Sequence, residues 1–320
     1  MEKMKIWLMI AAALVIIGAI IFVTVMSAYR WDFTKMGTSE FETNTYEIAD
    51  EFHSISMNTE IADIVFAVSQ DGICSVVCHE EQKLRHAVEV RDGVLTVTVV
   101  DEREWYDHIG IFVGTPKITV YLPESEYAEV CIKESTGDIE IPKDFQFESV
   151  DISVTTGDVK NYASASDMVK IKTSTGAICV EGVTTGVLDL SVTTGKVTVS
   201  DVNCEGNVTI NVSTGKSEVT NVRCANLESN GTTGGIKLNN VIAVEMLSVE
   251  RSTGDVQLDG CDASELYLKT TTGSIVGTLL TEKVFQAKST TGSVDVPNTI
   301  TGGRCAASTT TGNIKLSILN

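Results

Sequence analysis

Residues 188–215, LDLSVTTGKVTVSDVNCEGNVTINVSTG, contain the pattern that decides the fold of this chain. Apolar and polar residues alternate before Gly195 and again after it. Alternation with a period of two is typical of a strand that buries one face. Val192 and Val197, the apolar residues nearest to this glycine, lie an odd number of positions apart, so the inward-facing parity changes between them. We therefore predict a corner at Thr-Thr-Gly, where glycine supplies the freedom in φ that corners require.

A Ser/Thr-Thr-Gly triplet occurs in this register ten times, at intervals of 19 or 20 residues. Repeats of this length predict an all-β fold, a parallel β-solenoid (β-helix) of about ten coils, in which each strand pairs with its counterpart one coil along. Ten coils about 4.8 Å apart form a rod about 48 Å long. We expect one hydroxyl column of the corner to face inward and the other outward. The predicted structural corners are Thr136 and Gly137, Thr156 and Gly157, Thr175 and Gly176, Thr194 and Gly195, Thr214 and Gly215, Thr233 and Gly234, Thr253 and Gly254, Thr272 and Gly273, Thr291 and Gly292, and Thr311 and Gly312.

Residues 31–133 precede the repeats and lack this corner triplet, although they are also rich in strand-forming residues. Because a solenoid needs its ends covered, we predict that they form a β-rich N-terminal cap segment. The chain then divides into residues 1–30, a cytoplasmic stub and transmembrane anchor, the cap at 31–133, and the solenoid at 134–320. At the C-terminal end, the apolar positions of residues 314–319 have no evident cap, so we expect an open strand edge there.

Residues 6–26 form an uncharged, mostly apolar stretch of 21 residues. A helix of this length spans about 31 Å, enough to cross a hydrocarbon core of about 30 Å. The stretch is longer than the apolar region of a cleaved signal peptide, so we predict an uncleaved single-pass anchor, with cleavage near Ser27 as the alternative. Lys3 and Lys5 precede it, and the positive-inside rule then places the N-terminus in the cytoplasm and the bulk of the chain outside the cell membrane.

Composition excludes several classes of protein. The net charge of −19 argues against nucleic acid as a partner, because phosphates require a basic surface. The eight cysteines include no C-x-x-C pair, and we expect them to be free and buried. Cys74 and Cys78 share one face of a predicted strand, whereas His79 points to the other. We therefore predict neither a cofactor nor a metal site.

The repeats also lack candidate catalytic residues. No histidine follows His108, so a Ser–His nucleophile cannot be assembled there. The position after each corner glycine is expected to face outward, and only Asp138 and Asp158 place carboxylates on neighbouring coils. A solvated corner explains these two residues better than an acid–base pair does. We expect no catalytic residues and no enzymatic activity.

The best candidate for a contact loop lies in the cap, where aromatic residues concentrate. Trp105, Tyr106 and His108 stand among several acidic residues, and an aromatic side chain in a polar loop is a typical contact residue. The competing interpretation is that Trp105 plugs the end of the solenoid.

The sequence resembles the bacterial putative-adhesin family of membrane-anchored β-strand-repeat proteins, which carry a domain of unknown function. The resemblance covers about residues 40–320 and rests on the N-terminal anchor, Ala62-Asp63-Ile64, Leu122-Pro123, and the Ser-Thr-Gly-Asp segments at Gly137 and Gly254. It implies a β-repeat fold on a Gram-positive cell envelope, with some relatives linked to envelope stress. The family pattern offers no catalytic residues, and most corners of this chain depart from its Gly-Asp form.

These observations predict a non-catalytic, extracytoplasmic β-solenoid anchored in the cell membrane, which acts as an adhesin or contacts the envelope. Its expected partners are a surface glycan, a wall polymer or another envelope protein. The alternative is an envelope-stress sensing or regulatory protein that acts through a membrane partner. A polysaccharide-active β-helix enzyme is a distant third possibility.

Overall fold

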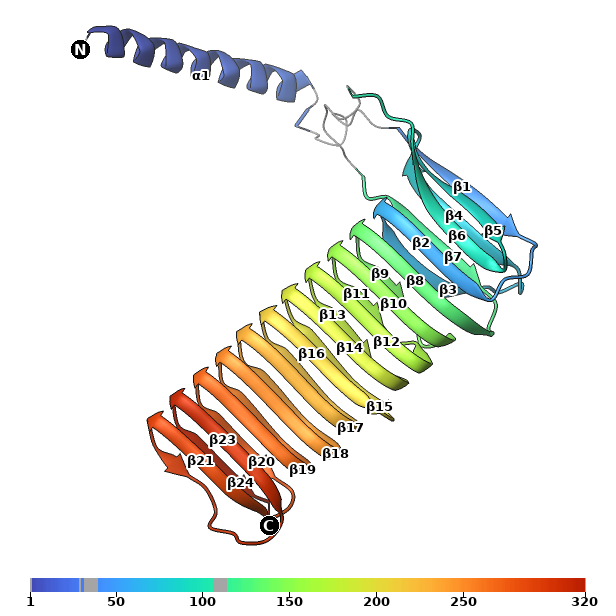
Figure 1. The fold of residues 1–320 in the computed structure, drawn as a ribbon. Coiled ribbons are helices and arrows are strands. Elements are labelled where there is room, and N and C mark those ends of the chain that lie inside the picture. Colours follow the sequence, from blue (N-terminus) through green and yellow to red (C-terminus); the bar gives the residue numbers. More distant parts are fainter. Residues whose placement is uncertain (1, 29, 32–39, 106–113, 320) are drawn as a thin grey trace.

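The computed structural model describes residues 2–28, 30–31, 40–105 and 114–319. One helix, α1 (Glu2–Ala28), precedes a stack of 24 strands that forms a long, regularly stepped rod (Figure 1). Nearly every apolar residue that alternates inward in the repeats is buried, and together these residues form one continuous core. The predicted all-β solenoid behind a single apolar helix is confirmed.

Each coil contributes a long strand before its corner glycine and a shorter strand after it. In the first half of the rod the long strands are β8 (Glu126–Thr136), β10 (Gln146–Thr156), β12 (Ser164–Thr175), β14 (Thr184–Thr194) and β16 (Asn207–Thr214). The shorter strands are β9 (Ile139–Ile141), β11 (Val159–Asn161), β13 (Ile178–Glu181) and β15 (Val197–Cys204). Farther along, short and long strands merge into β17 (Ser217–Thr233), β18 (Ile236–Thr253) and β19 (Val256–Thr272). All of these strands pair in parallel.

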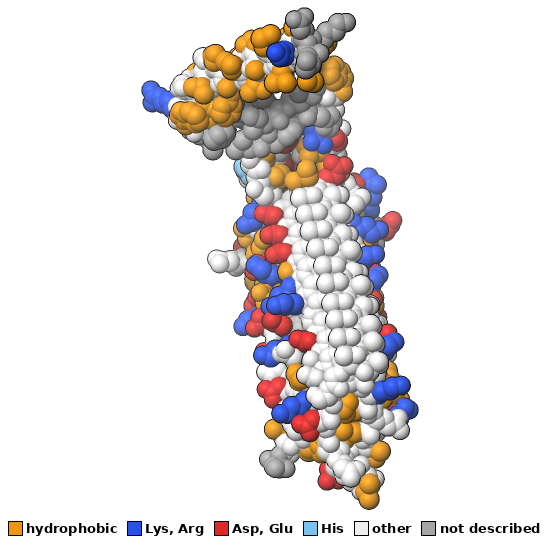
Figure 2. Space-filling model, turned by 90° about the vertical axis from the view of Figure 1, so that its left-hand side faces the viewer, with side chains coloured by type: hydrophobic (Ala, Val, Ile, Leu, Met, Phe, Trp, Pro, Cys, Tyr) orange, Lys and Arg blue, Asp and Glu red, His pale blue; other side chains and the backbone are white. Residues whose placement is uncertain are grey.

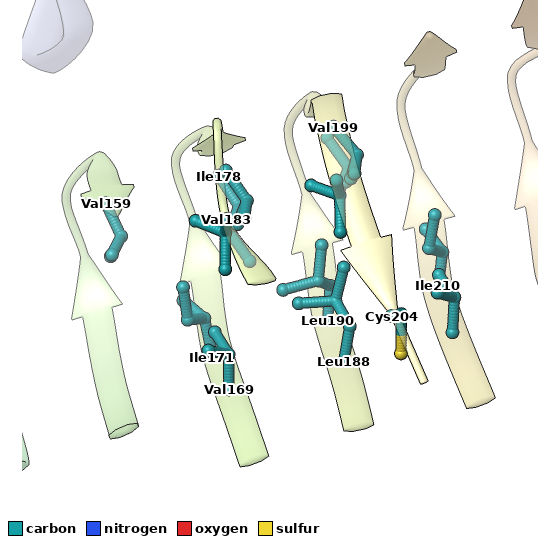
Figure 3. Packing of buried hydrophobic residues seen from close by; sticks show 14 of the residues in the cluster. Val159, Val169, Ile171, Ile178, Val183, Leu188, Leu190, Val199, Cys204 and Ile210 are labelled. Atoms are coloured by element: carbon teal, nitrogen blue, oxygen red, sulfur yellow. The ribbon is translucent and has the colours of Figure 1, made fainter. Parts of the chain in front are cut away.

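The register between coils places like positions on top of one another. Ile171 pairs with Leu190, and Leu190 pairs with Ile210, each of them five residues before its corner glycine. Figure 3 shows these side chains stacked from coil to coil, with residues of the shorter strands, such as Val199, beside them. Because the three stacked side chains are fully buried, every added coil extends the core of the coil before it.

The cap extends both faces of the solenoid. β2 (Ser54–Ile61) and β3 (Asp63–Val68) form a further coil, with Ala62 at the corner position, and pair in parallel with β8 and β9. On one face, β2 is followed outward by β6 (Val94–Asp101) and then β5 (Leu84–Arg91). On the other, β3 is followed by β7 (Lys117–Leu122), β4 (Cys74–Glu81) and β1 (Phe41–Ile48). The outer strands of the cap are antiparallel, so the cap ends the parallel stack while the two faces continue through it.

The corner glycines bring neighbouring coils unusually close together. At Gly215 the φ angle is +147°, and a Cβ atom built there would lie 1.6 Å from the carbonyl oxygen of Gly195. The amide of Gly195 donates to the carbonyl of Thr214 on the next coil, at 2.9 Å, and the other corners repeat this bond. Glycine is therefore required by both conformation and space.

Both hydroxyl residues before each glycine face solvent or are half-exposed, so the expectation that one column would face inward was wrong.

A second column of left-handed residues lies on the other side of each coil, and the sequence pattern had not revealed it. Gly182, Asp201, Asn221, Asn240 and Gly260 follow one another at intervals of 19 or 20 residues, all with φ between +50° and +70°. The Asn221 amide donates to Asp201 Oδ1 at 2.8 Å, and the Asn240 amide donates to Asn221 Oδ1 at 3.0 Å. Asn and Asp tolerate this conformation, and here they also link three coils.

One coil in the middle of the rod accommodates a buried arginine. Arg251 occupies an inward position and is only 2% exposed. Its guanidinium donates to the backbone and hydroxyl oxygens of Ser229, to Ser217 Oγ and to the carbonyl of Glu250. A Cβ on Gly231 would lie 3.0 Å from Arg251 Cδ and Nη1. The neighbouring coil has Ser229 and Gly231 in place of apolar side chains, and it therefore offers the guanidinium both space and hydrogen-bond acceptors. Burial lowers the pKa of Arg251 to about 10.

The last two coils are stacked in the reverse of their sequence order. After β20 (Ile275–Leu279), the chain forms β21 (Lys283–Thr291) and β22 (Val294–Asp295), and then β23 (Gly303–Thr311) and β24 (Ile314–Ile318). β23 pairs with β19 on one side and β21 on the other, and β24 lies between β20 and β22. Figure 1 shows β21 at the far end of the rod, beyond β23. The expectation of strictly sequential pairing was therefore wrong. The expected open edge at residues 314–319 is seen in part: Ile314 and Lys315 pair with β22, whereas residues 316–318 pair with β20 alone among the described strands, so the exposed edge comprises β21, β22 and the end of β24.

Two adjacent glycines allow the chain to return between these coils. A Cβ on Gly302 would lie 1.8 Å from the carbonyl oxygen of Glu282, and one on Gly303 would lie 1.9 Å from that of Ser264. Beside this crossing, Lys283 is buried and its ammonium lies 2.6 Å from Asp262. The close backbone contact and the buried ion pair both lie where the chain crosses between the reversed coils.

We predict that replacing Gly215 by alanine lowers the free energy of unfolding by about 3 kcal/mol or more, because the methyl group meets a neighbouring carbonyl and the backbone is strained. Urea unfolding followed by far-UV circular dichroism measures this change. Gly182→Asn is the matched control, since nothing lies within 4 Å of its Cβ position and asparagine fits its φ of +68°. A loss in the control as large as in Gly215→Ala would contradict this account of the corner.

The reversed order of the last coils predicts which engineered cysteines can form a disulfide. Thr272 pairs with Thr311 on the adjacent strand, whereas Thr291 lies one strand farther away. Thr272→Cys with Thr311→Cys should cross-link under mild oxidation, because adjacent strands are about 4.8 Å apart. Thr272→Cys with Thr291→Cys should not, since about 9.6 Å separates those strands. Mass spectrometry of digested protein gives the result, and the opposite outcome would restore the sequential order.

Candidate functional site

A continuous surface feature runs along the rod: the corner stripe, defined here as the ten Ser/Thr-Thr-Gly triplets from 135–137 to 310–312. Figure 2 shows it as an uncharged band along the rod, with charged side chains on both sides. Its spacing is fixed by backbone pairing, for example of Thr156 with Thr136 and with Thr175. The stripe is therefore a stiff, periodic array of hydroxyl groups.

The two neighbouring carboxylates beside this stripe have a backbone role. Asp63 accepts the amide of Asp138 at 3.0 Å, Asp138 accepts that of Asp158 at 2.8 Å, and Asp158 accepts that of Ala177 at 2.7 Å. Asp255 and Ser274 repeat the arrangement later in the rod, at 2.8 Å. An Asp after the corner glycine thus binds the next coil, which explains the Ser-Thr-Gly-Asp segments.

Trp105, the described member of the predicted contact loop, is 74% exposed. It follows β6, and β6 runs parallel to β2, so it lies at the same end of the sheet as the corner of Ala62. Nearby, Arg103 forms a bidentate pair with Asp101, with both nitrogen–oxygen distances at 2.8 Å. The tryptophan therefore stands near the N-terminal end of the corner stripe. Tyr106 and His108, the other two members of the loop, lie outside the described residues.

A groove of about 700 Å³ lies at the opposite end of these strands, where the cap meets the solenoid. Phe52 and Tyr127 stack at its base with ring centroids 6.0 Å apart, and Phe147 follows at 5.9 Å from Tyr127. The Tyr127 hydroxyl donates to the carbonyl of Pro123 at 2.9 Å, and burial raises its pKa to about 12. The rim carries Glu47, Asp50 and Glu51, which make the groove acidic. This groove was not evident in the sequence, because its lining comes from three separate segments.

Glu134 occupies the inward position before the first corner glycine, where other coils have residues such as Val154. Burial raises its pKa to about 7. Its Oε1 accepts the amide of Thr136 at 3.2 Å, while Oε2 and the adjacent Thr59 hydroxyl have no partner among the described residues. This carboxyl group lies at the junction of cap and solenoid, since Glu134 pairs with Thr59 of β2.

A further feature lies inside the cap. Cys78, Glu80 and His86 are all buried, and one potential ligand atom from each lies within 4.8 Å of the others. His86 Nδ1 is 2.7 Å from Glu80 Oε2. The expected separation of Cys78 and His79 onto opposite faces is seen. This cluster was not evident in the sequence, because Glu80 and His86 come together only through the hairpin that brings β5 beside β4.

The fold defines a β-solenoid protein with one N-terminal apolar helix. The chain belongs to the Toastrack DUF4097 family, whose pattern matches residues 52–213 and again residues 205–320. This match confirms the family resemblance that the sequence motifs indicated. No curated protein matches the chain.

Several solved structures are similar to this chain at low sequence identity. One is a putative adhesin from Bacteroides fragilis, with a TM-score of 0.42 and 15% identity over 88% of this chain and 97% of that one. Another is a putative adhesin from Parabacteroides distasonis, with a TM-score of 0.47 and 13% identity over 75% and 98% of the two chains. A protein from the same organism, described as a putative lipid binding protein, has a TM-score of 0.43 and 17% identity over 75% and 95%.

The raised pKa of Glu134 predicts a pH-dependent cost to stability. A carboxyl group that ionises less readily in the folded state binds more protons there, so the free energy of unfolding falls as pH rises from about 4.5 to about 7. Glu134→Gln removes this cost, and its stability advantage over the wild type should grow by up to about 3 kcal/mol across that range. Urea unfolding at a series of pH values measures the difference. Glu140→Gln, at an exposed position of β9, is the control, and a pH-independent effect of Glu134→Gln would contradict the assignment.

Proposed function

We propose that this protein is a non-catalytic rod tethered to the cell membrane, which contacts a glycan or wall polymer of the envelope. The observation that carries the proposal is the combination of a 25-residue apolar helical stretch, Met4–Ala28, with a stiff rod whose exposed corner stripe repeats a hydroxyl pattern from coil to coil. A helix of this length spans about 38 Å, more than a hydrocarbon core requires. The rod then keeps the contact surface in fixed geometry from coil to coil.

The flanks of the helix support an extracytoplasmic rod. Lys3 and Lys5 lie at the N-terminal end of α1, before the uncharged stretch 6–26, and positive charge favours the cytoplasmic side. Trp7 and Trp31 lie near the two ends of the apolar stretch, where aromatic side chains favour the membrane interface. Trp31 packs edge-on against Phe22, with ring centroids 6.3 Å apart. This arrangement supports an anchor with residues 31–320 outside the cytoplasm.

The contact surface that we propose combines Trp105 with the adjacent end of the corner stripe. Sugars bind through stacking of their apolar faces on aromatic rings and through hydrogen bonds to their hydroxyl groups. An exposed indole at the same end of the strands as the column of Ser and Thr hydroxyls offers both kinds of contact. The stripe carries no charge, so neutral polymers meet no electrostatic penalty along it (Figure 2).

The alternative, a regulator that acts through a membrane partner, is favoured by α1. Most of its apolar side chains are exposed along its whole length, from Met4 to Val25, which leaves a surface for another transmembrane helix.

The test uses the full chain in lipid nanodiscs, incubated with isolated wall polymers. The proposal expects saturable binding that weakens at least tenfold in Trp105→Ala and is unchanged in Tyr267→Ala, an aromatic side chain on the distant strand β19. The bound polymer should keep its chain length, and shortening would refute the non-catalytic assignment. If folded wild-type protein binds none of the polymers, the adhesion proposal fails, and specific co-purification of a membrane protein would then establish the regulator.

A further inference from the structure

The far tip of the rod has unpaired strand edges on both of its faces. Among the described strands, β21 pairs only with β23, and β22 pairs only with β24. The end of β24 beyond Lys315 pairs with β20 alone. At the other end of the rod, the antiparallel strands of the cap continue both faces. The last coil therefore offers backbone groups to a partner, and the first coil does not.

The burial of equivalent positions shows that the core is also open at this tip. Leu266 and Cys305, each seven residues before a corner glycine, are fully buried, whereas Phe285 at the same position of the last coil is only partly buried. Ala287 is likewise partly buried, although Ala307 on the adjacent strand is 1% exposed. These side chains retain apolar area that a partner stacked on the tip would remove from water.

The charges on the outward side of β21 are arranged symmetrically about Phe285. Glu282, just before the strand, and Lys288 each lie three residues from this phenylalanine, and the exposed residues between them, Val284 and Gln286, are uncharged. The Glu282 carboxylate accepts the Thr301 hydroxyl, and neither Glu282 nor Lys288 forms an ion pair with another described residue. A second β21 strand, antiparallel and centred on Phe285, would place each Glu282 opposite a Lys288.

We propose that two copies of this chain pair tip to tip, with their β21 strands antiparallel and centred on Phe285. A two-fold axis at this residue forms two Glu282–Lys288 pairs between the copies and sets the two Phe285 rings against each other at the ends of the two cores. A single peptide strand fits this tip less well, because it pairs with one edge and leaves the core open. The tip of a second copy presents an edge on each face with an open core between them, so it covers both edges and the core at once.

This pairing goes beyond the polymer contact proposed above and does not depend on it. The cap strands lie at the opposite end of the rod from β21 (Figure 1). The two caps of a tip-to-tip pair therefore point away from each other. With α1 as a membrane anchor, which is part of the proposed function, such a pair joins two separate membranes and not two neighbours in one membrane.

The test measures self-association of the full chain in detergent by analytical ultracentrifugation, without any polymer. The wild type should form dimers. Lys288→Glu should weaken dimerisation at least tenfold, because two attractive pairs become two repulsive ones. The double variant Glu282→Lys, Lys288→Glu exchanges the signs and restores both pairs, so it should dimerise like the wild type. Damage to the fold by either substitution would not be reversed by combining them.

The matched control is Lys172→Glu in the middle of the rod. Lys172 is exposed and lies four residues before its corner glycine, as Lys288 does, so this variant should dimerise like the wild type. Because α1 is the same in every variant, association through this helix alone would be insensitive to all of the substitutions. Folded wild-type protein that stays monomeric, dimers that Lys288→Glu does not weaken, or a double variant that does not recover would each overturn the proposal.

A second assay tests the joining of two membranes. Lipid vesicles that carry the wild type should cluster, and vesicles that carry folded Lys288→Glu should not. Clustering that the double variant restores would support contact between tips across two membranes. Dimers in detergent without clustering of vesicles would leave the pairing intact and refute its role between membranes.

Discussion

The close approach of neighbouring coils at the glycine corners is the constraint on which the rest of the structure depends. At Gly215 the backbone passes so near to Gly195 that no side chain fits, and the amide–carbonyl bonds between corners fix the register. This register stacks the apolar residues of each coil on those of the next. It also aligns the Ser and Thr hydroxyls into one stripe and lets Asp63, Asp138 and Asp158 bind the following coil. A single geometric requirement thus sets the core, the surface and the pitch of the rod.

Sequence periodicity could predict the rod because burial and corners repeat together. It could not predict the order of the last coils, since every coil carries the same pattern and any one of them can stack on any other. The reversal depends on contacts specific to Gly302, Gly303 and Lys283. The second column of turns was visible as Asp201, Asn221 and Asn240 at repeat spacing, but only their positive φ angles reveal the turn.

The candidate sites also differ in whether the sequence alone could point to them. Trp105 could be chosen as a candidate from the sequence because an aromatic residue in an acidic stretch is a local signal, and its role as a contact residue stays a prediction. The groove around Tyr127 and the cluster of Cys78, Glu80 and His86 could not, because strand pairing and not sequence proximity assembles them. Arg251 shows the same dependence on contacts between neighbouring coils inside the rod. Taken alone, Gly231 looks like a defect in the core, yet the arginine of the next coil fills the space that it leaves.

The reversed coils also determine when the molecule can be completed during its synthesis. Strands β21 and β22 find ladder partners only in β23 and β24, which lie at the very end of the described chain. As the polypeptide emerges from the ribosome or crosses the membrane, each earlier coil can dock on the one before it. Residues 283–295 reach their final ladder only after the last strands have been made, because β23 and β24 lie between them and the preceding coil. The far tip of the rod is therefore the last part to form, and a chain that stops short of β23 leaves that tip with exposed, unpaired backbone.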